Sequence, residues 1–312
     1  MRVWRSLDQV PADLGSTVVV IGNFDGVHLG HQHVIARARE VAGAAGVPLV
    51  AVTFDPHPMA VLRPDHAPLT LTGIEARCEL LVAAGADDVL VIPFSRDIAA
   101  WTPQEFITRV IVDALHARAV VVGANFRFGN RASGDVTTLS AAGWDAGFTV
   151  EGIALDGGPQ VWSSTYVRTC LVAGDVEGAA EALGRPYAVS GVVVQGDQRG
   201  RDLGFPTANV PTHDIAAPAD GVYAGWLRRT DDPAQAPFPA AISVGTNPTF
   251  DGERERRVEA YVLDRTDLAL YGVPVEISFV ARIRGMVAFE GIDALVETMK
   301  GDVVKTRALL DL

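Results

Sequence analysis

The sequence predicts an open α/β domain followed by a mainly antiparallel β-barrel domain that ends in a helix. Three observations support this prediction. The chain has 312 residues, a length more typical of two domains than of one. Short apolar runs alternate with helical patterns up to Arg185, and runs that mix apolar and polar residues follow from Tyr187 onward. We therefore expect one domain over residues 1–185 and a second over residues 186–312.

The first domain is expected to hold a parallel sheet. Its apolar runs are continuous, as in strands that helices cover on both faces. Between these runs, apolar residues such as Val34, Ile35 and Ala38 recur at helical spacing. The predicted strands lie at residues 16–22, 47–54, 87–94, 118–124 and 148–155.

The second domain is expected to begin after a helix. The Ala-rich stretch 175–183 predicts a helix that ends at Gly184, and Arg185-Pro186 follows as the boundary. Apolar residues at helical spacing over 292–310 predict one helix that packs against the barrel. The predicted barrel strands lie within residues 187–196, 221–229, 238–245, 256–264 and 273–284, with a polar hairpin loop at 230–237.

Composition excludes several classes of protein. The formal charge is −12 and neither half carries a basic arm, so general binding to duplex nucleic acid or anionic membranes is not expected. The sequence shows no signal peptide and no apolar stretch long enough to span a membrane. Two distant cysteines, Cys78 and Cys170, fit a reducing cytoplasm. Lys300 and Lys305 are the only lysines, so a phosphate-binding lysine early in the chain is impossible.

A glycine-rich turn joins the first predicted strand to a helix. Its sequence is GNFDGVHLGH, residues 22–31. Exposed amides and the positive end of the helix dipole favour phosphate at such a place. His28 and His31 would project to the same side, while Gly30 lets a ligand approach the backbone. The alternative is an ordinary turn in which the histidines only cap the helix.

Three further segments carry polar or aromatic residues. TFDPHP (53–58) follows the second strand, and its prolines hold His57 in a rigid loop. GANFRFG (123–129) follows the fourth strand, where aromatic side chains suit a flat ring and an amide suits hydrogen-bond recognition. SSTYVR (163–168) places hydroxyls and a guanidinium at a helix start, which suits phosphate. Each segment also has a structural interpretation, as a turn, as core or as a capped surface helix.

The second half has a glycine-rich segment of its own, GVVVQGDQRGRDLGFPTANV, residues 191–210. Gly191, Gly196, Gly200 and Gly204 allow amides to curl around phosphates without a P-loop lysine.

A carboxylate is the better candidate for a general base in this half, because His213 is its only histidine. Strand alternation places Glu259 on one face with Tyr261, where burial would raise its pKa. A surface ion pair between Glu259 and Arg256 or Arg257 is the alternative.

Together these motifs resemble a known family. HLGH resembles the signature of the HxGH nucleotidyltransferases, whose domain is Rossmann-like. With the three further segments, the longer string is similar to the adenylyltransferase domain of the bacterial bifunctional riboflavin kinase/FAD synthetase family. GDQRGRDLGFPTAN (196–209) matches the riboflavin kinase pattern GxxxGRxLGFPTAN at every fixed position. The resemblance extends across the whole chain.

The resemblance implies two ATP-dependent steps: riboflavin to FMN in the barrel, then FMN to FAD with release of pyrophosphate in the α/β domain. It implies that Thr207 and Asn209 bind Mg²⁺, that Glu259 is catalytic, and that His28 and His31 act in adenylyl transfer. The residues expected at nucleotide or phosphate are Gly22, Phe24, Asp25, Gly26, Gly30, Ser163, Ser164, Thr165, Arg168, Gly196, Gly200, Arg201 and Gly204. Those expected at the flavin are His57, Asn125, Arg127, Phe128, Tyr223 and Met299, of which Tyr223 suits the core equally well.

Two positions depart from the family pattern. Asn125 stands where many relatives have Asp, so whether this position must be charged stays open. Trp162 replaces an aliphatic residue.

The expected partners are riboflavin, FMN, FAD, ATP, ADP and pyrophosphate, with no nucleic acid and no membrane; a weak homo-oligomer is compatible with the sequence. We expect a cytoplasmic enzyme in which FMN leaves one site before it enters the other. One competing function is an enzyme that keeps a single activity, which intact motifs in both halves oppose. A flavin carrier or flavin-responsive nucleic-acid regulator is opposed by the acidic charge. A class I aminoacyl-tRNA synthetase would need a lysine-rich second signature that this sequence lacks.

Overall fold

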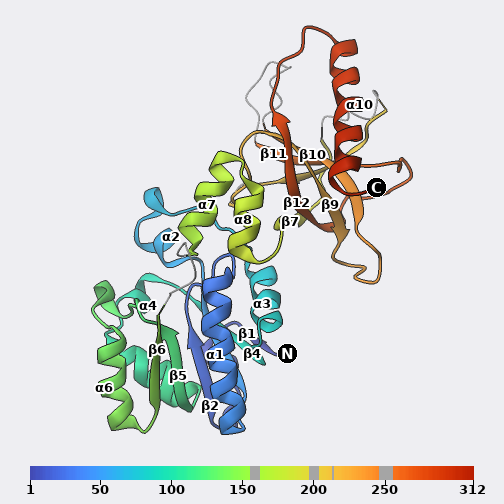
Figure 1. Cartoon of the computed structure of the whole chain (residues 1–312). Helices are drawn as coiled ribbons and strands as arrows, with labels where there is room; N and C mark the ends of the chain where they lie inside the picture. The colour runs from blue at the N-terminus through green and yellow to red at the C-terminus, as the bar shows by residue number, and fades with distance from the viewer. Residues whose placement is uncertain (155–161, 197–203, 213, 246–255) are drawn as a thin grey trace. The chain divides into compact units, whose positions relative to one another are not determined.

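The computed structural model describes residues 1–154, 162–196, 204–212, 214–245 and 256–312 (Figure 1). These residues form two compact units. One consists of Met1–Thr70 and Ile74–Ser163, and the other of Leu71–Gly73 and Ser164–Leu312.

The first unit contains a fully parallel sheet of six strands. In chain order the strands are β1 (Val3–Trp4), β2 (Thr17–Ile21), β3 (Leu49–Asp55), β4 (Asp88–Pro93), β5 (Ala117–Gly123) and β6 (Thr149–Ile153). Their order across the sheet is β1-β4-β3-β2-β5-β6. The five predicted strands are confirmed to within two residues at each end. Only the two-residue strand β1 was not predicted.

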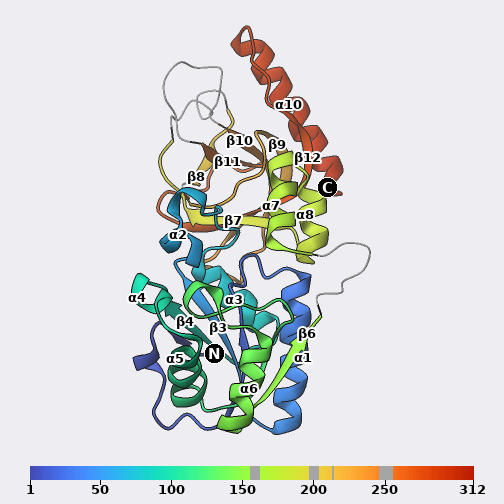
Figure 2. The same ribbon diagram turned by 90° about the vertical axis from the view of Figure 1, so that its left-hand side faces the viewer.

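Helices cover both faces of this sheet (Figure 2). One core contains the side chains of Val18 and Val20 from β2 together with those of α1 (Leu29–Ala45) and α3 (Ile74–Ala83). The other contains Val19 and Ile21 together with the π-helical segment η3 (Ile107–Ala114) and α6 (Val136–Ala146). Alternate residues of β2 thus enter opposite cores, which explains its continuous apolar run. Shorter elements are η1 (Leu7–Gln9), α2 (Pro58–Leu62), η2 (Pro64–His66), α4 (Arg96–Ala99), α5 (Pro103–Phe106) and η4 (Asn130–Ala132).

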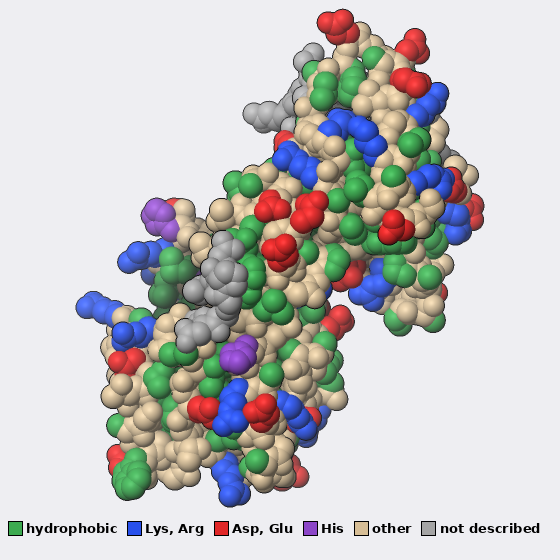
Figure 3. Space-filling model, in the orientation of Figure 1, with side chains coloured by type: hydrophobic (Ala, Val, Ile, Leu, Met, Phe, Trp, Pro, Cys, Tyr) green, Lys and Arg blue, Asp and Glu red, His purple; other side chains and the backbone are tan. Residues whose placement is uncertain are grey.

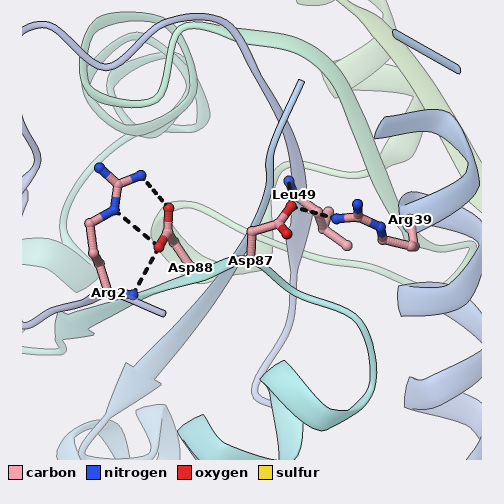
Figure 4. Close-up of polar contacts among 5 residues, drawn as sticks. All are labelled: Arg2, Arg39, Leu49, Asp87 and Asp88. Atoms are coloured by element: carbon pink, nitrogen blue, oxygen red, sulfur yellow. Dashed lines mark hydrogen bonds and ion pairs between the residues drawn. The ribbon is translucent and has the colours of Figure 1, made fainter. Parts of the chain in front are cut away.

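Ion pairs and hydrogen bonds join the elements at the amino ends of the strands (Figure 4). The Arg2 guanidinium donates to both carboxylate oxygens of Asp88, at 3.1 and 2.6 Å. Asp87 accepts from the amide of Leu49 at 2.8 Å and from Arg39 of α1. The carboxyl ends of the parallel strands lie at the opposite edge of the sheet from these contacts.

The strand order reverses at β2, which has β3 on one side and β5 on the other. Ligands of open α/β sheets gather at the carboxyl ends of strands next to such a reversal. The three loops that follow β2, β3 and β5 contain the GNFDGVHLGH, TFDPHP and GANFRFG motifs.

The second unit contains an antiparallel sheet of six strands. They are β7 (Tyr187–Val192), β8 (Thr207–Pro211), β9 (Gly221–Arg229), β10 (Phe238–Gly245), β11 (Arg257–Val262) and β12 (Pro274–Gly285). Their order is β7-β12-β9-β10-β11-β8, and a bridge between Val194 and Asn209 joins the first to the last. The predicted barrel and the predicted C-terminal helix, α10 (Ile292–Leu309), are confirmed, whereas β8 lies outside the five predicted strand ranges.

Two helices precede the barrel in this unit, α7 (Ser164–Ala173) and α8 (Val176–Leu183). Gly184 ends α8 at a φ of +69°, as the sequence predicted. The amide of Ala219 donates to Leu171 O at 2.8 Å, and Arg282 of β12 donates to Ala173 O at 3.2 Å. Because α7 and α8 pack with the barrel, the first compact unit ends at Ser163 and not at residue 185. The division of the two activities at residue 185 stays a prediction.

Both cysteines are buried and free. None of the helices in the described parts of the chain combines the length and apolarity that a membrane crossing requires. On the face drawn in Figure 3, lysine and arginine side chains of the described residues lie scattered among acidic ones.

Candidate active sites

The loop between β2 and α1 has an unusual backbone. Phe24, Gly26 and Val27 have φ angles of +49°, +84° and +41°. A residue with a Cβ loses about 1–2 kcal/mol in this left-handed region. Phe24 and Val27 are 2% and 1% exposed, so burial of their side chains offsets that cost. Burial of these two apolar side chains therefore helps to stabilise the conformation of the loop.

His28 and His31 lie together at the start of α1. His28 is the N-cap residue, and its Nδ1 accepts from the amide of His31 at 3.4 Å. The two imidazole rings stack with centroids 3.6 Å apart, and the Phe24 ring meets His31 edge-on at 5.2 Å. Both parts of the sequence interpretation are thus present: the histidines share one side, and one of them caps the helix.

The environment of His31 keeps its ring neutral. Burial lowers its pKa well below the ordinary value, and the nearby His28 and Arg77 lower it further. Within the described part of the chain, its Nδ1 is buried without a hydrogen-bond partner. Because His28 Nδ1 accepts a hydrogen bond, a neutral His28 carries its proton on Nε2.

Two glycines of this motif allow close approaches. A Cβ on Gly30 would lie 3.1 Å from the His28 ring and 3.2 Å from the carbonyl oxygen of Trp162. A Cβ on Gly22 would lie 3.0 Å from the Phe24 ring. Side chains at these positions would therefore push the histidine or the loop away.

The loop after β3 meets the loop after β2. His57 caps α2 by accepting from the Met59 amide at 3.1 Å, and its Nε2 lies 3.4 Å from Asn23 Nδ2. Thr53 Oγ1 donates to Asn23 O at 2.9 Å. Two of the three predicted loops are thus in contact.

The predicted flavin residues in the loop after β5 differ in their exposure to solvent. Asn125 and Arg127 are exposed, and Arg127 lies 3.4 Å from Asp135. Phe128 is 7% exposed and packs on Phe106 and Phe126, so it lies in the core. A flavin contact at Phe128 stays a prediction, and its half-buried neighbour Phe126 offers more surface.

The segment predicted to bind phosphate, residues 163–168, spans the point in the sequence where the first unit ends and the second begins. Ser163 ends the first unit, while Ser164, Thr165 and Arg168 lie at the start of α7 in the second. Their role in phosphate binding stays a prediction.

In the barrel, strand register brings the predicted kinase residues together. Glu259 of β11 pairs directly with Asn209 of β8, and Tyr261 pairs with Thr207. Side chains of directly paired residues have Cβ atoms about 5 Å apart on the same face. Asn209 is 5% exposed, and its Nδ2 lies 3.4 Å from Thr207 Oγ1. A carboxylate, an amide and a hydroxyl therefore share a small area of one face.

Arg256, one of the predicted ion-pair partners of Glu259, contacts other groups. It lies 2.8 Å from Asp220 and donates to the carbonyl of Ala217.

The glycine-rich segment approaches this area closely. A Cβ on Gly196 would lie 2.7 Å from the Asn209 amide, so only glycine fits there without displacing Asn209. Gly204 has a φ of +85°, which favours glycine. Gly200 and Arg201 lie outside the described residues.

A pocket of about 420 Å³ lies next to Thr207. Its wall is mostly apolar and includes Val193, Ala260 and Leu270, with Tyr271 and Arg265 from the segment after β11. Such a mixture suits a planar heterocycle.

Two predicted flavin contacts of the barrel differ in exposure. Tyr223 is fully buried, with its hydroxyl 2.6 Å from Ala219 O, and burial raises its pKa. Met299 is half-buried on α10. The structure thus places Tyr223 in the core, the alternative that the sequence left open.

The oxygen donors fit Mg²⁺ better than a soft metal. Among the described residues, no three His, Cys, Asp or Glu side chains gather as a metal site. Thr207 Oγ1 and the amide oxygen of Asn209 are hard oxygen ligands, which Mg²⁺ accepts together with water and phosphate oxygens.

Comparison with known proteins identifies the family. One family model, FAD synthetase, matches residues 10–165, and another, riboflavin kinase, matches residues 183–310. The bifunctional riboflavin kinase/FMN adenylyltransferase of Escherichia coli K12 is 35% identical over all of this chain and 98% of its own. The chain belongs to this bifunctional family. It is an enzyme with a riboflavin kinase domain and an FAD synthetase domain, as the resemblance implied.

Other relatives agree. The enzyme of the same name from Pseudomonas fluorescens is 36% identical over 99% of this chain and 98% of its own. A crystal structure from Streptococcus pneumoniae, described as a macrolide-efflux protein, has a TM-score of 0.83 at 32% identity and covers 98% of each chain. The similarity to this crystal structure covers the folds of both halves of the chain.

Several residues at the sites were not predicted. Asn23 lies inside the first motif but was not assigned a role, although its carbonyl accepts from Thr53 and Arg77 and its side-chain amide lies 3.4 Å from His57. Arg77 lies on α3, outside every motif. The sequence could have indicated it, because it places a positively charged residue on the same helical face as the apolar Cys78 and Leu81. Tyr271 carries no motif, and only the pocket reveals it.

Proposed function

We propose that the barrel transfers the γ-phosphoryl group of ATP to riboflavin, and that the α/β unit transfers the adenylyl group of a second ATP to the resulting FMN. The register that pairs Glu259 with Asn209 supports this most, because it sets a carboxylate beside groups suited to phosphate and metal. FMN leaves the first site before it enters the second. We also propose that the enzyme works in the cytoplasm.

In the kinase step, Glu259 accepts the proton of the ribityl hydroxyl as the hydroxyl oxygen attacks the γ-phosphorus, and ADP leaves. Thr207 and Asn209 would hold Mg²⁺, which when bound neutralises phosphate charge. Backbone amides of the glycine-rich segment from Gly196, with Gly200, Arg201 and Gly204, orient the phosphates. The base of ATP occupies the pocket beside Thr207, while Met299 borders the flavin.

In the adenylyl step, a phosphate oxygen of FMN attacks the α-phosphorus of ATP and pyrophosphate leaves. The nucleophile is already anionic, so alignment and charge neutralisation matter more than a base. His28, His31 and the amides at the start of α1 donate to phosphate oxygens. Ser163, Ser164, Thr165 and Arg168 hold the pyrophosphate, and His57, Asn125 and Arg127 contact the flavin.

A time course tests the assignment. The purified chain is incubated with riboflavin, ATP and Mg²⁺, and the flavins are separated and quantified by fluorescence. We expect FMN to appear first and FAD to follow, and both to stop when EDTA removes the metal. Accumulation of FMN without FAD would contradict the second activity, and binding of riboflavin without any product would indicate a carrier.

A further inference from the structure

Arg77 is a buried cation next to the adenylyltransferase motifs but outside all of them. It lies on α3 and is 2% exposed. Charged side chains are almost never buried this deeply unless other groups compensate them. Its position therefore needs an explanation beyond packing.

The guanidinium of Arg77 contacts the loop after β2 and the end of β3. Its Nη1 donates to the carbonyl of Asn23 at 3.2 Å and to that of Phe54 at 3.1 Å. Its Nη2 lies 3.7 Å from Asp25 Oδ1, and Asp25 is also 2% exposed. One side chain thus joins the end of β3 to the loop that follows β2.

These contacts fix the orientation of a peptide in the phosphate loop. Because a trans peptide is planar, a carbonyl of Asn23 that points at Arg77 directs the amide N–H of Phe24 the opposite way. Of the next residues, Phe24, Gly26 and Val27 hold left-handed conformations that lead into His28. A planar, forked cation can hold two carbonyls and a carboxylate at once, which a lysine ammonium cannot reproduce with the same geometry.

We propose that Arg77 is a positioning residue for adenylyl transfer: it ties the loop after β2 to the end of β3 and so keeps His28 and His31 aligned. The proposal rests on the function proposed for the α/β unit. Arg77 acts through the loop and is not assigned a contact with substrate.

Two substitutions test it, with FAD formation from FMN measured apart from FMN formation from riboflavin. We expect Arg77→Gln to lower the kcat of FAD formation about a hundredfold and Arg77→Lys about tenfold, with KM for FMN and ATP within about threefold of wild type. FMN formation by the same molecules should be unchanged. Arg2→Gln is the control, because it breaks an arginine ion pair with the buried carboxylate of Asp88 (Figure 4), at the amino ends of the strands, and should leave both rates unchanged.

A spectroscopic measurement separates positioning from partial unfolding. His28 and Arg77 are the charged or titratable groups that act on the pKa of His31, and Asp25 pairs with Arg77. In an NMR titration we expect the pKa of His31 to rise in Arg77→Gln, because one of the cations that lower it is removed, and to stay low in Arg77→Lys. A smaller folded fraction would not move it.

The outcomes distinguish the two hypotheses. Absence of FAD formation in the wild type would contradict the proposed function itself. A wild-type enzyme that forms FAD, with a folded Arg77→Gln variant of unchanged kcat, would overturn the role of Arg77 alone, as would an equal loss of both activities. Should Arg77→Gln not fold, an Arg77→Lys variant with wild-type kcat would overturn it as well.

Discussion

The two candidate sites are built in opposite ways. In the α/β unit, the groups come from the start of α1 and from loops after parallel strands, and three of the four residues from Phe24 to Val27 have positive φ angles. In the barrel, Thr207, Asn209 and Glu259 lie on paired strands, where the hydrogen-bonding register fixes their spacing. A site on loops needs support from buried groups elsewhere, whereas a site on paired strands carries its support in the sheet.

The chemistry of the two steps matches this difference. A hydroxyl nucleophile needs a base at a defined place, and a carboxylate on a strand provides one. A phosphate nucleophile needs donors around a negative charge, and a helix start with two imidazoles provides those. The following predictions test whether the two sites are separate in this sense.

The largest effect is expected at Glu259. Glu259→Gln keeps the shape of the side chain but removes the proton acceptor, so we expect kcat for FMN formation to fall by about 10²–10⁴-fold. Conversion of FMN to FAD should be largely intact. Both rates are measured by separating the flavins after incubation with each substrate.

Glu276→Gln provides the matched control, because Glu276 lies on β12 in an ion pair with Arg228 at 3.0 Å. It should leave FMN formation unchanged. Equal loss of both activities in Glu259→Gln would refute separate sites.

The next effect is expected at the histidines and concerns the other activity, FAD formation. His28→Ala combined with His31→Ala removes two donors at the start of α1, and loss of one such donor costs on the order of a hundredfold in rate. FAD formation should therefore stop or fall by at least that factor, while FMN formation from riboflavin continues. Undiminished adenylylation would remove these histidines from the mechanism.

His33→Ala is the control for this pair, because His33 is an exposed residue of the same helix. It should not change either rate.

The sequence predicted the strands of the first unit well because each is buried on both faces and therefore continuously apolar. It missed β1, whose two residues are too few for a pattern, and also β8 of the barrel. In the barrel, alternation showed which residues of β11 share a face but not that Glu259 pairs with Asn209. That register depends on hydrogen bonds between strands fifty residues apart in the chain.

The site of the first unit was predicted as a set of motifs rather than as a geometry. Phe24 and Val27 adopt left-handed conformations that sequence propensity assigns mainly to glycine and asparagine. Their conformation becomes understandable only with the buried contacts of the loop, including those of Arg77. For Phe128 and Tyr223 the sequence suggested a flavin contact, but both side chains lie in the core. Aromatic residues next to a site are equally suited to either place.

The smallest expected effect concerns stability against acid. In the folded chain the pKa of His31 lies well below its ordinary value, mainly because of burial, so the folded state stays unprotonated at pH values where the unfolded chain binds a proton. The free energy of unfolding should therefore fall as the pH drops below about 6.5, by at most about 1.4 kcal/mol per pH unit from this residue. His31→Asn should remove that part of the slope when calorimetric unfolding at pH 7.5 and pH 5 is compared. His33→Asn, on the exposed side of α1, should keep the wild-type slope. Identical slopes for wild type and His31→Asn would mean that His31 is protonated in the folded chain, and the helix start would then hold phosphate with an imidazolium instead of a neutral ring.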